Sequence, residues 1–208
     1  MGYQLREVSV PILPRGASDI RILHFSDLHL TPRRKKEIAD IKSWASINPD
    51  LVISTGDFLA HRDAVETALN SLNELLDKPG LYVFGSNDYY APRFKNPLTY
   101  LQKDDGTRKL GTKLPTEELD QELTQRGWIN LNNRKSSISV KGIAIDIRGT
   151  DDAHLELDDY SQVAGSPQGV ISIGVTHAPY SRVLDGMKRD GIDLILSLIH
   201  ISEPTRPY

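Results

Sequence analysis

Short apolar runs alternate with amphipathic stretches through the first half of this chain. Residues 21–25, 51–55 and 81–84 form largely apolar runs, typical of buried parallel strands. Between them, residues 33–47 and 63–76 carry apolar side chains at helical spacing. The resulting β-α-β-α-β order predicts a parallel sheet whose strands are joined by helical crossovers.

Flanking and later segments extend this pattern. Residues 4–13 are predicted to form an opening strand, which Pro11 restricts to the edge of a sheet. Residues 91–114, rich in proline, glycine and charged residues, are expected to form an insertion beside the functional site. Further helices are predicted at 116–126, with Thr116 as N-cap, and at 181–189. The remaining strands are predicted at 128–131, 136–140, 143–147, 170–175 and 192–196.

Composition narrows the class of protein. The 208 residues suit one domain, and 38% of them are hydrophobic and 25% charged, which is ordinary for a globular protein. The net charge of −3 does not favour nucleic acid as a partner. The absence of cysteine excludes disulfides, zinc–thiolate sites and a thiol nucleophile. We therefore expect a cytoplasmic protein that does not bind nucleic acid.

Carboxylates and imidazoles follow several of the predicted strands. Asp27 and His29 come directly after the first core strand, and their spacing places them on the same side of extended chain. Asp57 follows the second strand, and His177 follows the strand at 170–175. Open α/β sheets bind ligands at the carboxyl ends of their strands. Because carboxylate and imidazole together suit zinc, manganese or iron, these residues predict a metal site.

The predicted site suits hydrolysis of a phosphate ester. Two metal ions about 3.5–4 Å apart clamp the attacking and leaving oxygens of a phosphoryl displacement. A bound water then loses its proton near pH ~7, so that no acidic side chain is needed as general base for attack. The strand-end residues thus favour a hydrolase.

The order of these motifs resembles the calcineurin-like metallophosphoesterases. An Asp-x-His pair, a Gly-Asp pair, a Gly-Asn-containing turn and a lone histidine after a strand occur in that order, and residues 22–29 are close to the opening block of the family. The resemblance covers residues 21–195, and its Gly-Ser-Asn-Asp-Tyr turn is most similar to actinobacterial and bacillar members. It implies an α/β fold, a four-layer α-β-β-α sandwich.

The resemblance also implies roles for individual residues. Asp27 and His29 would hold the first of two divalent metal ions, manganese, zinc or iron. Asp57 would bridge both ions, and His177 would hold the second together with an amide oxygen from the turn at 85–88. The implied reaction is hydrolysis of phosphodiester or pyrophosphate bonds by water that the dinuclear metal activates.

The turn at 85–88 departs from the family pattern. Aligned without gaps, Ser86 stands where the family has its ligand asparagine, and Asn87 stands where the family has a histidine that helps protonate the leaving group. An amide cannot act as a general acid near neutrality. Either Asn87 binds the metal, or the second metal is held weakly; we favour Asn87 as the ligand and catalytic residue. Tyr89 and Arg93, just beyond the turn, are candidates for substrate binding.

The C-terminal stretch departs further. The family has a Gly-His-Thr/Ser-His motif after the last predicted strand, whereas here His200 stands alone. Residues 196–206 look like the translation of a transposon adapter used in sequencing-library preparation. We therefore expect a phosphoesterase domain at 1–197 that lacks its C-terminal strands, and a non-native tail at 198–208. For this chain we expect weak metal binding at best and little turnover.

Several further residues have two interpretations. His24, in the middle of a strand, is expected to be a hydrogen-bonded core histidine. His61 either lines the rim of the site or is an exposed loop residue. Asp151, Asp152 and His154 resemble a family loop near the site, but aspartates in a turn commonly cap backbone amides.

A basic run at the start of a predicted helix also has two interpretations. Arg33, Arg34, Lys35 and Lys36 lie where the helix macrodipole disfavours cations, which suggests attraction of a phosphate or an anionic lipid headgroup. A solvated charge run is the simpler explanation and is favoured. Members of the family that this chain resembles often carry an upstream membrane anchor. If such an anchor has been lost from this sequence, the protein that carries it would be membrane-associated.

The sequence favours a metal-dependent phosphoesterase that acts on a phosphodiester or pyrophosphate, with a lipid precursor among the candidate substrates. The alternative is a non-catalytic metal- or ligand-binding domain with a degenerate, incomplete site. The altered turn at 85–88 and the missing histidine pair support this alternative.

Overall fold

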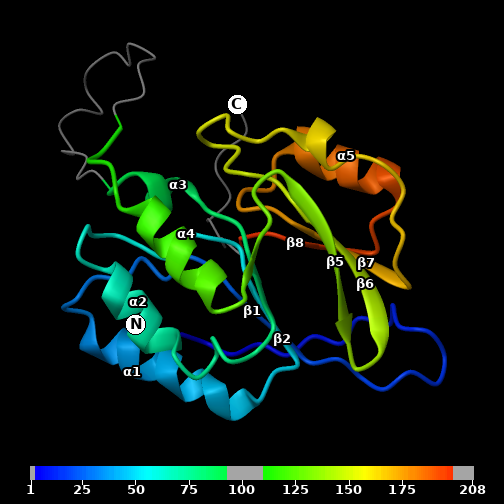
Figure 1. Ribbon diagram of the computed structural model, residues 1–208, viewed down its shortest axis with the longest axis horizontal. Helices are drawn as coiled ribbons and strands as arrows, with labels where there is room; N and C mark the ends of the chain where they lie inside the picture. Colours follow the sequence, from blue (N-terminus) through cyan, green and yellow to red (C-terminus); the bar gives the residue numbers. More distant parts are fainter. Residues whose placement is uncertain (1–2, 93–109, 199–208) are drawn as a thin grey trace, which may run out of the picture.

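Two four-stranded sheets form the centre of the structure, a computed structural model that describes residues 3–92 and 110–198 (Figure 1). The strands of the first sheet are parallel and follow the chain order. They are β1 (Ile22–Phe25), β2 (Leu51–Ser54), β3 (Gly80–Tyr82) and β4 (Ile129–Asn130). The helical segments between them are α1 (Lys35–Ser43) with a 3₁₀ turn (Trp44–Ile47), α2 (Val65–Leu72), α3 (Ser86–Tyr89) and α4 (Thr116–Gln125). The predicted β-α-β-α-β order is confirmed.

The second sheet begins with an antiparallel hairpin and continues with parallel strands. Its order is β5 (Arg134–Val140), β6 (Ile143–Gly149), β7 (Ile171–Val175) and β8 (Leu194–Leu196). Lys141 and Gly142 form the hairpin turn with φ values of 48° and 79°. A short 3₁₀ turn (Tyr160–Gln162) lies between β6 and β7, and α5 (Ser181–Asp190) joins β7 to β8.

Alternating side chains of the first sheet serve two separate cores. Val52 packs with apolar residues of α1, α2 and α4, whereas its neighbours Leu51 and Ile53 pack with strands of the second sheet. On the second sheet, Met187 of α5 lies over Gly174, where a β-carbon would come within 2.6 Å of its sulfur. The order is therefore helix, sheet, sheet, helix, which confirms the expected four-layer α/β sandwich.

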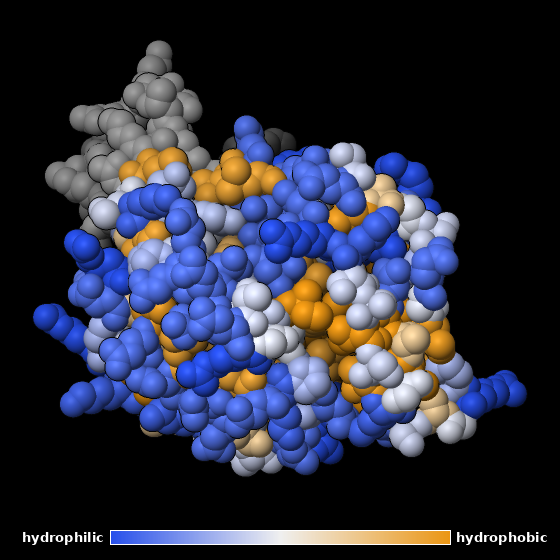
Figure 2. Space-filling model, viewed as in Figure 1, coloured by the Kyte–Doolittle hydropathy of each residue, from blue (hydrophilic) through white to orange (hydrophobic). Residues whose placement is uncertain are grey.

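The two sides of the sandwich differ in surface character. Figure 1 shows α1, α2 and α4 together on one side of the molecule and α5 with the second sheet on the other. On the face shown in Figure 2, the side with α1, α2 and α4 is mainly hydrophilic, while apolar side chains gather where Figure 1 places β5 and β6. None of the helices in residues 3–92 and 110–198 is long and apolar enough to cross a membrane.

Two details of the predicted elements are wrong. Residues 4–13 form no strand; most of them are exposed, and Ile12 and Leu13 pack against the core between the sheets as irregular chain. Apolar character there reflects this packing and not a ladder of hydrogen bonds. Thr116 is the first residue of α4 and not its N-cap, because its hydroxyl donates to the carbonyl of Asp88 (2.6 Å) instead of accepting from the helix.

The described ends of the predicted insertion at 91–114 lie next to α3. The backbone N–H of Ala91 donates to the carbonyl of Thr112 (2.8 Å), and that of Leu114 donates to the carbonyl of Tyr89 (2.8 Å). Residues 93–109, including the candidate Arg93, lie outside the described part of the chain.

Candidate metal centre

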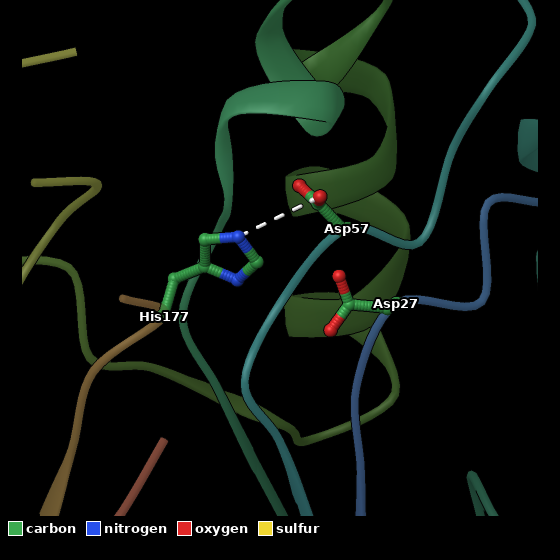
Figure 3. A group of neighbouring side chains, drawn as sticks. All are labelled: Asp27, Asp57 and His177. Atoms are coloured by element: carbon green, nitrogen blue, oxygen red, sulfur yellow. Dashed lines mark ion pairs between the residues drawn. The ribbon is translucent and has the colours of Figure 1, made fainter. Parts of the chain in front are cut away.

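Three side chains that could hold a metal ion, from both sheets, meet at the carboxyl ends of their strands. Asp27 follows β1, Asp57 follows β2 and His177 follows β7, and one potential ligand atom of each lies within 4.8 Å of the others. Figure 3 shows the two carboxylates on neighbouring loops of the first sheet, with His177 reaching toward Asp57 from the second. Asp57 and His177 are each only 2% exposed.

The loops that carry the two aspartates run side by side and are joined by backbone hydrogen bonds. The N–H of Asp27 donates to the carbonyl of Gly56 (3.0 Å), and the N–H of His29 donates to the carbonyl of Asp57 (2.9 Å). Asp27, His29 and Asp57 have φ values of 57°, 44° and 60°. These left-handed conformations cost roughly 1–3 kcal/mol each outside glycine, and such strain clusters at functional sites.

Gly56 permits the close approach of the second loop to the turn after β3. Its φ is 99°, and a β-carbon there would lie 2.5 Å from the backbone nitrogen of Gly85. Gly85 is equally confined, because its β-carbon would lie 2.3 Å from Asp57 Oδ1 and 2.6 Å from His177 Cε1. Gly56 is therefore needed for both space and conformation, whereas Gly85 in the turn at 85–88 is needed for space alone.

Asp88 is fully buried and accepts four backbone N–H groups, three from the Asp57 loop and one from its own turn. Its Oδ2 accepts from Asp57 (2.7 Å) and Gly85 (3.0 Å), and its Oδ1 accepts from Phe58 (2.7 Å) and Leu59 (3.2 Å). Burial and the neighbouring Asp57 carboxylate raise the pKa of Asp88, while these N–H groups act in the opposite direction. The sequence reasoning gave Asp88 no role, although it closes the motif that was singled out.

Asn87 contacts Asp57 through two nitrogen atoms. Its backbone N–H donates to Asp57 Oδ1 (2.8 Å), and its side-chain amide donates to Asp57 Oδ2 (2.7 Å). Asn87 therefore orients the carboxylate of Asp57. Ser86 and Asn87 both line the cleft described below, and the choice of Asn87 as an oxygen ligand stays a prediction.

His177 is aimed at Asp57 by the backbone of the first sheet. Its Nδ1 donates to the carbonyl of Thr55 (2.7 Å), which leaves Nε2 as the free acceptor. That Nε2 lies 3.5 Å from Asp57 Oδ2. A backbone carbonyl on the other ring nitrogen is the arrangement that fixes a metal-binding histidine tautomer.

His29 approaches the same carboxylate from the opposite loop. Its Nε2 lies 3.5 Å from Asp27 Oδ1 and 3.7 Å from Asp57 Oδ2. Burial opposes protonation, but the two carboxylates outweigh burial and raise the pKa of His29. Burial raises the pKa of Asp27, but the contact with His29 and the hydrogen bond from the Ser26 hydroxyl (2.5 Å) outweigh it and lower this pKa. The buried Nδ1 of His29 has no hydrogen-bond partner among the described residues.

The donor set fits a divalent metal ion. Two carboxylates and two imidazoles offer the oxygen and nitrogen ligands that zinc, manganese and iron accept. Asp57 and Asp88 place two carboxyl groups in a buried region where like charges repel, as the raised pKa of Asp88 indicates. A cation held by Asp27, Asp57 and His177 would offset this repulsion.

A cleft of about 690 Å³ opens over these side chains. It is lined by Asp27, His29, Asp57, Ser86, Asn87, His154, His177, Ala178, Pro179, Tyr180, Ser181 and Leu198. Tyr89 is not part of this lining: its hydroxyl donates to Asp151 Oδ1 (2.7 Å) and accepts from the Asn132 amide (3.0 Å). Its proposed contact with substrate stays a prediction.

The structure favours one interpretation for several residues that had two. His24 is partly buried and hydrogen-bonded to the Thr55 hydroxyl (3.1 Å), which supports its interpretation as a structural histidine. His61 is exposed and accepts from the backbone of Asp63 (3.1 Å), outside the cleft lining. Asp151 and Asp152 accept backbone N–H groups of their own loop, which is turn chemistry.

His154 and the basic residues 33–36 lie near the candidate metal centre, but only His154 is part of the cleft lining. The basic residues 33–36 are all exposed, and Arg34 donates to the carbonyl of His29 (3.1 Å) and pairs with Glu37 (3.3 Å). Contact of this run with an anionic lipid surface stays a prediction. His200, the remaining histidine of interest, lies outside the described residues.

The model of the calcineurin-like phosphoesterase family matches residues 20–197, and the chain belongs to this family. Among solved structures, the crystal structure of TT1561 of Thermus thermophilus is similar at 16% identity and a TM-score of 0.47. That similarity covers 86% of this chain and 81% of that chain. No curated protein matches the sequence. The likeness to actinobacterial and bacillar members and the non-native character of residues 198–208 stay predictions.

Proposed function

We propose that this protein is a metal-dependent phosphoesterase whose metal ligands include Asp27, His29, Asp57 and His177. The observation that carries the proposal is the convergence of both histidines on one oxygen. His29 Nε2 and His177 Nε2 lie 3.7 and 3.5 Å from the same Oδ2 of Asp57. An oxygen approached by ligands from two sides is suited to be shared between two ions, which supports two divalent metals, manganese, zinc or iron.

Neighbouring groups of the protein hold the proposed metal ligands in position. A divalent metal, when bound, acts as a Lewis acid and lowers the pKa of water. Asn87 and Asp88 hold Asp57 in place, and the Thr55 carbonyl fixes the tautomer of His177. Burial of Asp57 and His177 keeps the ligands in a region of low dielectric constant, where electrostatic stabilisation of developing charge is strong.

The cleft suits a substrate larger than phosphate itself. Its volume of about 690 Å³ lies within the range of ordinary small-molecule sites. We infer a phosphodiester or pyrophosphate substrate, with a lipid precursor as one candidate and nucleic acid not expected. The protein would act in the cytoplasm. A solvated charge run remains the favoured interpretation of Arg33, Arg34, Lys35 and Lys36, and contact of this run with an anionic membrane surface is the alternative.

Hydrolysis of bis-p-nitrophenyl phosphate tests the proposal. Turnover is measured with manganese, zinc, ferrous iron or magnesium and with a chelator, in the wild type, Asp57→Asn and Asp63→Asn. Asp63 is a matched control because its side chain is 70% exposed and contacts only the side chains of His61 and Arg62 within ion-pair distance among the described residues.

We expect slow, metal-dependent turnover that Asp57→Asn abolishes and Asp63→Asn preserves. Loss of groups that merely orient a ligand costs about 10- to 100-fold, so loss of the shared ligand itself should cost at least about 100-fold. Absence of turnover with every metal, or near-normal turnover of Asp57→Asn, would contradict the proposal.

A non-catalytic metal-binding domain is the second candidate. It is favoured by Asn87, which stands where the family has a histidine and donates its amide to Asp57. This alternative predicts that Asp57→Asn weakens manganese binding in calorimetry while the wild type hydrolyses neither a phosphodiester nor a pyrophosphate.

A further inference from the structure

His154 and Tyr180 form a hydrogen-bonded pair that lines the same cleft as the metal centre. The pair joins the loop after β6 to the start of α5. The Nδ1 of His154 lies 3.0 Å from the Tyr180 hydroxyl, and the two rings are 5.3 Å apart. The His154 ring also lies 6.1 Å from that of His177. The pair therefore stands beside the ligand cluster, and the metal-binding set does not include it.

Arg182 braces this pair from the outer side. Its guanidinium lies 4.7 Å from the centroid of the Tyr180 ring. It also forms a bidentate ion pair with Asp158 (2.6 and 2.8 Å) and donates to the carbonyl of Ala153 (3.1 Å). One arginine thus connects the residue next to His154 with the ring of Tyr180. Bidentate geometry restricts such a side chain more than a single contact does.

The loop of His154 is fixed on its inner side as well. The Oδ2 of Asp152 accepts the backbone N–H of Leu155 (2.9 Å), and Asp152 is fully buried. A partly buried histidine held between two anchored residues is a pre-organised group, which loses little entropy when it meets a ligand.

We propose that His154 is a substrate-binding residue that donates a hydrogen bond from Nε2 to an oxygen of the phosphoester. In this proposal the Tyr180 hydroxyl is the donor to Nδ1, so that the neutral His154 ring carries its hydrogen on Nε2. The side-chain amide of Asn87 already donates to Asp57. His154 would therefore supply a further side-chain N–H, on the second-sheet side of the cleft. The inference rests on the proposed phosphoesterase function and extends it to substrate recognition.

The test compares His154→Ala, His154→Gln and Tyr180→Phe with the control His61→Ala. His61 is exposed and outside the cleft, so its removal should leave activity unchanged. Each variant is assayed for manganese-dependent hydrolysis of bis-p-nitrophenyl phosphate and for manganese affinity. Binding of inorganic phosphate to the manganese-loaded protein is measured by calorimetry, which does not depend on turnover. Thermal unfolding shows that each variant is folded.

A hydrogen bond to a charged group typically contributes enough to change affinity by about 10- to 100-fold. We therefore expect His154→Ala to weaken phosphate binding and lower kcat/KM by about this factor, with manganese affinity unchanged. His154→Gln, which retains an N–H donor, should recover part of the loss, and Tyr180→Phe should show a smaller loss.

Three results would overturn the inference. The first is phosphate binding by His154→Ala within twofold of the wild type. The second is a manganese affinity that falls as much as phosphate binding does, because His154 would then act on the metal. The third is a wild type that does not bind phosphate. If the wild type binds phosphate through His154 but hydrolyses no ester, the proposed function fails and the binding role of His154 stands.

Discussion

The two sheets contribute to the candidate metal centre by different means. The first sheet supplies Asp27, His29 and Asp57 on two loops that are joined by backbone hydrogen bonds and anchored by Asp88. The second sheet supplies His177, whose ring is held by one hydrogen bond to a carbonyl of the first sheet. These two groups of residues are the first and second halves of the centre. The first half is fixed within its own layer, whereas the position of the second half depends on how the two sheets pack against each other.

This difference explains where strain is tolerated. The left-handed residues of the centre all belong to the first sheet, where several hydrogen bonds determine each loop. His177 follows a regular buried strand and needs no unusual backbone. The first half should therefore respond to loss of its internal anchor, and the second half to anything that separates the layers.

Removing the anchor of the first half should have the largest effect. Asp88→Ala leaves four buried N–H groups without their acceptor, and each unsatisfied group costs about 1–3 kcal/mol. We expect a loss of at least about 4 kcal/mol in the free energy of unfolding and loss of manganese binding. Urea denaturation and calorimetry measure the two effects. A loss below about 1 kcal/mol would show that the Asp57 loop does not rely on Asp88.

Removing a buried anchor of the second sheet should destabilise the protein without touching the centre. Arg148 of β6 is 1% exposed and pairs with Asp146 (2.9 Å) and Asp190 (3.4 Å). Breaking a buried ion pair from one side costs about 3–5 kcal/mol. For Arg148→Met we expect about 3 kcal/mol of lost stability by urea denaturation. Manganese affinity at a temperature where the variant is folded should match the wild type; a tenfold loss would tie this network to the site.

Stability should fall in acid because of His24, which links β1 to Thr55 at the end of β2. Burial lowers the pKa of His24 to about 4, below the ordinary value of 6.5 in the unfolded chain. The unfolded state then binds the proton first, so stability is lost as the pH falls from about 6.5 toward 4. The contribution is on the order of 3 kcal/mol.

The His24 effect is measured as a difference between proteins. Unfolding free energies in urea are compared at pH 7 and pH 5 with a chelator present, for the wild type and His24→Leu. The variant should lose less stability over this interval than the wild type does. Equal losses would show that other groups carry the acid sensitivity.

Gly85→Ala tests the junction between the two halves. The new β-carbon would crowd both Asp57 and His177. We therefore expect manganese affinity to fall by about 10- to 100-fold, with a loss of stability smaller than that of Asp88→Ala. Gly142→Ala is the control: it has a φ of 79°, and a β-carbon there meets no described atom within 4 Å. This control should lose about 1 kcal/mol of stability and keep its metal affinity. Equal metal affinities of the two variants would mean that the halves tolerate separation.

The sequence predicted the strand ends well because apolar runs and the residues after them are local features. Asp27, Asp57 and His177 each follow such a run, and their convergence follows from the rule for parallel sheets. The four-layer fold required the family resemblance, since the pairing of β6 with β7 across a long connection is not a local property.

The remaining features depend on tertiary contacts. The role of Asp88 was missed because an aspartate in a turn resembles a cap of its own turn, whereas three of its four donors come from the Asp57 loop. The pairing of His154 with Tyr180 requires α5 to pack beside the loop after β6. A signal was present for both: Asp88 is the last residue of the turn at 85–88, and Tyr180 stands three residues after His177.

Titration calorimetry of manganese into the wild type and Asp57→Asn tests the central claim most directly. The claim is that Asp57 is the carboxylate shared by both halves of a metal centre. It predicts measurable binding to the wild type and to Asp63→Asn, and an affinity at least about 100-fold weaker in Asp57→Asn. Binding of manganese to Asp57→Asn as tightly as to the wild type would contradict it.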